Sequence, residues 1–357
     1  MILLFLIHFK SVSQQTDSIM DYSISAKYGY GYTYAHHSSF FYLIKNYIQT
    51  YEVDFNYRTK GNKLWHKLYH YPTVGFGYHH ASLSNPQILG NANTLFTFIS
   101  APILETKNLK FSYKSSAGVA YLSKKFDLYN NNYNIAIGTN INAYLNLNLD
   151  FDIRVFDKVH ALFGFGIFHY SNGGLQQPNR GLNNIYLQTG ILYKLNKEES
   201  IPKIDSLPKI KKYNLFSIIY AIGFKGLEPA REKKYMVSSF SLNAERQIGH
   251  KSRIGIGLDL FKDNSRQEYL KIEGIENPGT TDLFYAGSHL SYDLVFGKTS
   301  FTIQMGVYAW QKAKHFQTSY HRFGVKYHFS KHFMANLTLK TYWAAADFSE
   351  WGIGYRF

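Results

Sequence analysis

A histidine and a serine stand two residues apart at the end of an alternating apolar segment, where their types and spacing could support nucleophilic catalysis. His169 and Ser171 share the parity of Phe163, Phe165 and Ile167, so on a β-strand all five side chains point the same way. Residues i and i+2 of a strand lie about 6.6 Å apart at Cα, and a bend at the strand end brings an imidazole nitrogen to a serine hydroxyl. Serine is a weak nucleophile until a neighbouring base takes its proton. The spacing therefore predicts Ser171 as nucleophile and His169 as general base.

A base of this kind needs a third group that fixes its tautomer, and the reaction needs donors for an oxyanion. Asn183, at the start of the next expected strand, can accept the imidazole N–H with its amide oxygen. The candidate oxyanion donors are backbone and amide groups that follow the serine: Asn172, Gly173, Gly174 and Asn179. The plainer interpretation of this run is an ordinary hairpin loop, with His169 at a membrane interface.

The same stretch resembles the PagL family of outer-membrane lipid A 3-O-deacylases, an acyloxyacyl-hydrolase-type group. The match runs in order and without gaps through His169, Ser171, Asn172, Gly174, Gln177, Pro178, Asn179 and Gly181. The resemblance implies His169 as base, Ser171 as nucleophile and Asn179 as a contributor to the oxyanion site. It also implies ester hydrolysis on lipid A that releases a 3-hydroxy fatty acid, with no cofactor and no metal.

The chain departs from the family pattern in two respects. The family's acidic triad member falls at Asn183, and the window from Gln176 to Leu195 contains no carboxylate. The familiar members are also about half this length, so the close resemblance covers roughly residues 21–195.

The elements around the motif alternate like strands of a membrane barrel. From Ile141 to Ile153, apolar residues alternate strictly with Asn, Asp and Tyr. The chain is rich in Tyr (31), Phe (28) and Gly (27), yet its mean hydropathy is −0.27, as expected when strands carry one lipid face and one polar face. An aromatic strand over residues 351–357 ends on Phe357 and resembles the assembly signal of outer-membrane barrels. We therefore predict an all-β fold, a transmembrane antiparallel β-barrel.

The pattern predicts about sixteen strands, which form one barrel or two eight-stranded barrels. We favour one barrel, because there is one terminal assembly signal. With a periplasmic N-terminus, the strand from Val159 to Tyr170 is about the seventh, which puts Ser171 at the outer-leaflet end.

The chain divides into four expected segments. Residues 1–13 read as a signal peptide, with a buried first strand as the alternative. Residues 14–195 form a deacylase-like barrel half that carries the active site. Residues 196–212 contain Lys and Pro and make a turn or linker. Residues 213–357 form the C-terminal barrel half. The absence of cysteine fits an exported protein.

The net charge of +15 suggests an anionic partner. Because the basic residues are scattered and form no recognisable nucleic-acid module, lipid phosphates are the better candidate than nucleic acid. Candidate phosphate contacts, with solvated loop charge as the alternative, are Arg180, Lys225, Lys233 and Lys234. The expected partners are lipid A or lipopolysaccharide, the outer membrane of a Gram-negative bacterium and its barrel assembly machinery.

A function of a different class remains open. The chain could be a non-catalytic barrel, a pore or a structural protein, in which an ancestral site has decayed. One wide barrel of about sixteen strands would favour the pore, since it can leave an aqueous channel.

Overall fold

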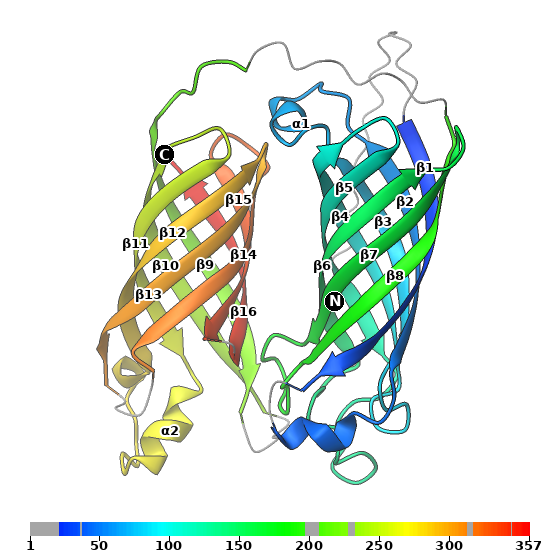
Figure 1. The fold of residues 1–357 in the computed structure, drawn as a ribbon. Helices are drawn as coiled ribbons and strands as arrows, with labels where there is room; N and C mark the ends of the chain where they lie inside the picture. The colour runs from blue at the N-terminus through cyan, green and yellow to red at the C-terminus, as the bar shows by residue number, and fades with distance from the viewer. Residues whose placement is uncertain (1–20, 36–37, 197–206, 228–232, 313–316, 344) are drawn as a thin grey trace.

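The described residues form two closed antiparallel β-barrels (Figure 1). The computed structural model describes residues 21–35, 38–196, 207–227, 233–312, 317–343 and 345–357. Within them it has sixteen strands, so the expected all-β class and strand number are confirmed. The expected signal peptide, residues 1–13, lies outside the described residues.

Each half of the chain closes on itself. The first barrel consists of β1 (Asp21–Tyr34), β2 (Ile48–Arg58), β3 (Thr73–Ser82), β4 (Asn91–Glu105), β5 (Leu109–Leu122), β6 (Ile141–Arg154), β7 (Val159–Ser171) and β8 (Leu182–Lys194), and β1 pairs with β8. The second consists of β9 (Asn214–Gly226), β10 (Lys234–Gln247), β11 (Ser252–Asp263), β12 (Phe284–Phe296), β13 (Thr299–Gln311), β14 (Ser319–His328), β15 (Phe333–Tyr342) and β16 (Ala345–Arg356), and β16 pairs with β9. The favoured prediction of one barrel was wrong, and the two-barrel alternative fits. One terminal assembly signal does not decide which strands close the sheet.

Four short helical segments lie in the connections. They are η1 (Ser38–Leu43), α1 (Leu64–Leu68), α2 (Arg266–Ile272) and η2 (Thr280–Leu283). Among the described residues, none of the helices has the length and apolar character needed to cross a membrane.

The alternation in the sequence becomes an outward and an inward face. On β6, Leu145 and Leu147 are exposed on the outside, whereas Asn146 and Asn148 are buried in the interior. An eight-stranded barrel has an interior just wide enough for side chains to fill. The polar residues of each strand therefore pack inside the barrel, and the alternating apolar residues lie on its outer surface.

We call the two ends of the barrels the linker end and the loop end. The linker end carries α1, the end of β8 and the start of β9, and it is at the top of Figure 1. The loop end carries η1, α2 and the β7–β8 connection (172–181). At the loop end of the first barrel, the interior holds an apolar core whose larger members are Phe40, Leu43, Ile48, Leu83, Leu89, Phe96, Phe98, Leu122, Ile137, Tyr144, Phe168, Tyr170, Leu182 and Tyr186.

The barrels contact each other at both ends. At the linker end, Tyr69 of the first barrel stacks on Phe296 of the second with ring centroids 4.0 Å apart, and its hydroxyl donates to the Val295 carbonyl. At the loop end, the Gly226 N–H donates to the Gly174 carbonyl at 3.1 Å. The connection that follows Ser171 is therefore itself part of the contact between the barrels.

Candidate active site

His169 and Ser171 lie at the loop end of β7, the seventh strand, on its outward face. Phe163, Phe165 and Ile167, which share their parity, are 50, 46 and 45% exposed, whereas Ser171 is buried. The serine is covered because the strand ends there and the 172–181 connection folds back over it. The alternation in the sequence thus predicts the outward direction of Ser171, and the 172–181 connection accounts for its burial.

Asn183 pairs directly with His169 across the β7–β8 ladder. Its amide oxygen lies 2.6 Å from His169 Nδ1. Gly181, at φ +71°, lies against the other side of the imidazole, where an added Cβ would come within 2.6 Å of His169 Cε1. The imidazole therefore lies between an amide partner and a glycine that leaves room for it, a role for Gly181 that sequence reasoning did not assign.

Two donors converge on the serine hydroxyl. The Gly173 N–H donates to Ser171 Oγ at 3.1 Å, and Asn179 Nδ2 donates to it at 3.0 Å. The hydroxyl in turn lies 3.3 Å from Asn179 Oδ1. The expected donors Gly173 and Asn179 are thus placed beside the oxygen of the candidate nucleophile.

The remaining amides of the motif hold the connection in shape. Asn172 Oδ1 accepts the Gly174 N–H, and its Nδ2 donates to the Gln176 carbonyl. Asn179 Oδ1 also accepts the Asn172 N–H at 3.1 Å, so one side chain holds both the serine and the residue after it. Asn172 and Gly174, predicted as oxyanion donors, bond to each other in this arrangement.

The connection between β5 and β6 packs against the 172–181 connection. The Gly181 N–H donates to the Ala136 carbonyl at 3.0 Å. A Cβ added at Gly138 would lie 2.7 Å from both the Gln176 and the Pro178 carbonyl oxygens. The close packing of these two connections therefore leaves no room for a side chain at Gly138.

Two family models match the chain. Residues 49–191 match the model described as lipid A 3-O-deacylase (PagL), and residues 214–357 match the one described as acyloxyacyl hydrolase, C-terminal domain. The chain belongs to the PagL-type family of lipid A deacylases. No curated protein matches this PagL-type chain.

Solved structures similar to this PagL-type chain are distant. A mutant porin of Rh. blastica is 7% identical with a TM-score of 0.18, over 95% of this chain and 100% of the porin. A chain from a structure titled "Asymmetric conductivity of engineered proteins" is 9% identical with a TM-score of 0.19, over the same shares. Scores this low carry no argument about fold or function.

The basic residues predicted to contact phosphate fall into two groups in this PagL-type protein. Arg180 and Lys234 are exposed, and Lys233 is exposed beside Glu268, with its Nζ 3.3 Å from Oε1. Lys225 instead points into the second barrel, where its Nζ lies 2.7 Å from Asp263 and 2.9 Å from Asp347. Lys225 therefore is not a solvated loop charge, because inward parity on β9 buries it.

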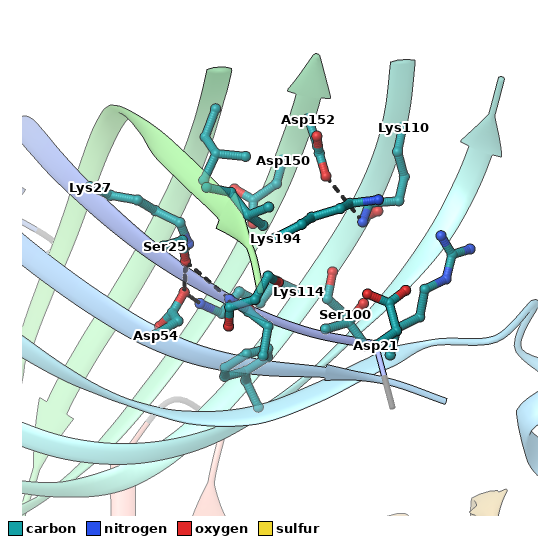
Figure 2. Close-up of a pocket in the computed structure, with 18 residues that line it drawn as sticks. Asp21, Ser25, Lys27, Asp54, Ser100, Lys110, Lys114, Asp150, Asp152 and Lys194 are labelled. Atoms are coloured by element: carbon teal, nitrogen blue, oxygen red, sulfur yellow. Dashed lines mark hydrogen bonds and ion pairs between the residues drawn. The ribbon is translucent and has the colours of Figure 1, made fainter. Parts of the chain in front are cut away.

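A polar cavity occupies the other half of the first barrel (Figure 2). Two of its lysines are directed at carboxylates: Lys27 and Lys114 each lie within 2.9 Å of both Glu52 and Asp54. None of the predicted site residues of this PagL-type protein lines the cavity. In the described part of the chain, no cluster of three or more His, Asp or Glu side chains is placed to hold a metal ion.

Proposed function

We propose that this protein is an outer-membrane serine esterase that removes an ester-linked 3-hydroxyacyl chain from lipid A. The observation that carries the proposal is the convergence of the Gly173 N–H and Asn179 Nδ2 on Ser171 Oγ. His169 stands on the same strand face, and family membership supports the substrate class.

In the proposed reaction, His169 takes the Ser171 proton as Oγ attacks the ester carbonyl carbon. With the Nδ1–H donated to Asn183 Oδ1, the basic lone pair lies on Nε2. The Gly173 N–H and Asn179 Nδ2 lie beside Oγ, and we propose that they donate instead to the ester carbonyl oxygen as it becomes negative in the tetrahedral intermediate. When the intermediate collapses, the sugar hydroxyl leaves with the proton from His169. Water, activated by the same base, then hydrolyses the acyl-enzyme and releases the 3-hydroxy fatty acid.

The outward position of the site suits a lipid substrate. The exposed residues Phe163, Phe165 and Ile167 lead along β7 toward His169 and would contact the acyl chains. Arg180, Lys233 and Lys234 remain as proposed phosphate contacts, because phosphates on the sugar attract exposed cations at the loop end. This arrangement implies that the loop end faces the outer leaflet and that the linker end faces the periplasm.

The test is release of free 3-hydroxy fatty acid from purified lipid A in detergent. We expect the refolded wild type to release it and both Ser171→Ala and His169→Ala to lose at least about 10³-fold in rate, the scale of the loss when a catalytic triad member is removed. If the correctly folded wild type releases no more than the two variants, the chain is a non-catalytic barrel.

A further inference from the structure

The ladder that closes the second barrel ends before its strands do. β9 and β16 pair from Ser217 and Arg356 up to Ile222 and Trp351. Beyond that point β9 continues to Gly226, and β16 begins as early as Ala345. The loop end of this seam therefore has backbone groups that the two strands do not share with each other.

The connection after Ser171 fits against this open end. The Gly226 N–H of β9 donates to the Gly174 carbonyl at 3.1 Å. A Cβ added at Gly174 would clash with the Asp347 carbonyl of β16, and one added at Gly173 would clash with Ser349 Oγ. Gly173 has a φ of +64° and Gly174 a φ of +86°, so the backbone conformation favours glycine at both positions. The Asp347 carbonyl adds a second reason for glycine at position 174.

Buried ion pairs hold the open end in shape. Lys225 of β9 lies 2.9 Å from Asp347 of β16 and so bridges the two strands where their ladder has ended. Lys340 of β15 lies 2.7 Å from the other Asp347 oxygen. Charges buried and paired in this way resist separation, because removing one partner leaves the other uncompensated. The surface that meets Gly173 and Gly174 is thus rigidly supported from inside the barrel.

We propose that the second barrel positions the nucleophile, with Ser349 and Gly226 as positioning residues that act through Gly173 and Gly174. The inference rests on the proposed esterase function. Gly173 is the residue whose N–H reaches Ser171 Oγ, so a shift of this glycine moves an oxyanion donor directly. A misplacement of about 1 Å costs about 10²-fold in rate when the geometry is catalytic.

The test enlarges the side chain that faces Gly173 and compares it with a matched serine. Ser349 is the fifth residue of β16 from its loop end, and Ser288 is the fifth residue of β12, also on the outward face. We expect Ser349→Leu to lower kcat for 3-hydroxy fatty acid release by at least about tenfold, with KM within about threefold. Ser288→Leu should stay within about twofold of the wild type.

A second measurement follows the connection without using activity. Arg180 is exposed within it, so the rate at which trypsin cuts after Arg180 in the folded protein, followed by mass spectrometry, reports local opening. We expect Ser349→Leu to raise that rate by at least about fivefold and Ser288→Leu to leave it unchanged. Equal cleavage in both variants, or an active Ser349→Leu enzyme with wild-type kcat, overturns the positioning role. If the wild type is inactive but trypsin cuts Ser349→Leu faster, the proposed esterase function is rejected. The contact by which the second barrel holds the 172–181 connection is then still supported.

Discussion

At the residue scale, the feature that most affects the proposed chemistry is the amide at position 183. A serine esterase forms an imidazolium during the reaction, and a carboxylate beside Nδ1 stabilises that charge better than an amide does. Asn183 supplies the hydrogen bond to His169 at 2.6 Å but no negative charge. The position thus has the geometry of a triad member without its electrostatics.

We therefore expect Asn183→Asp to raise kcat for 3-hydroxy fatty acid release. In a serine-protease triad, replacing the Asp by Asn lowers kcat about 10⁴-fold. We expect the opposite change at position 183 to gain part of that factor, about tenfold or more, because Asp matches Asn in shape. Initial rates with purified lipid A in detergent give the measurement. Asn183→Leu, which cannot accept from Nδ1, is the control and should fall below the wild type. A rate for Asn183→Asp at or below that of Asn183→Leu would contradict the assignment of position 183.

Much of the first barrel's share of the site follows from sequence. Parity puts His169 and Ser171 on one face, and the ladder pairs His169 with Asn183. The contribution of the second barrel could not be predicted. Ser349 and Gly226 stand far along the chain in segments with no motif, and only the closure of two separate barrels brings them to Gly173 and Gly174.

At the element scale, the strands were predictable and their closure was not. Alternation reports only that one face is polar and the other apolar, and it is the same for eight strands as for sixteen. Closure depends on whether β8 pairs with β1 or with β9. The 351–357 segment gave no help, because a terminal strand must pair with some partner in either arrangement. The short α1 segment was not predicted either, although its turn carries the linker-end contact.

The turn that contains α1 makes that contact sensitive to pH. Burial, together with the nearby Lys63, lowers the pKa of His66 from its ordinary value to about 4. The folded turn therefore prefers neutral histidine. Its stabilising contribution is complete above the unfolded pKa of about 6.5 and is lost as the pH falls toward 4. We expect the contact of Tyr69 with Phe296 to loosen over this range.

Tryptophan emission can follow this loosening. Trp65 adjoins His66, with ring centroids 4.2 Å apart, so a variant with Phe at positions 310, 343 and 351 isolates its signal. The urea midpoint of the Trp65 change should fall between pH 7 and pH 5. In the same background, His66→Gln should show a midpoint that is independent of pH over this range. A midpoint that falls equally in both proteins would assign the effect to another group.

At the scale of the whole molecule, apolar and paired charged side chains occupy the interiors of both barrels. The first contains an apolar core at the loop end and lysine–carboxylate pairs toward the linker end. In the second, Arg322 donates to Asp259 and Glu350, and Lys326 lies 2.7 Å from Glu245. Buried charges that are paired and hydrogen-bonded in this way bind strands of the same barrel across its interior. Two closed eight-stranded units replace the single wide barrel that would have favoured the pore.

We therefore expect the protein to show no channel activity. An eight-stranded barrel leaves room for its own side chains and no continuous water column, whereas sixteen strands in one ring can enclose a channel. Refolded protein added to a planar lipid bilayer should give no conductance steps above those of the bare bilayer, while a sixteen-stranded porin added in the same detergent gives them. Discrete steps from the wild type would mean that an interior opens in the membrane. Steps that increase when Arg322→Ala removes the side chain between Asp259 and Glu350 would locate the opening in the second barrel.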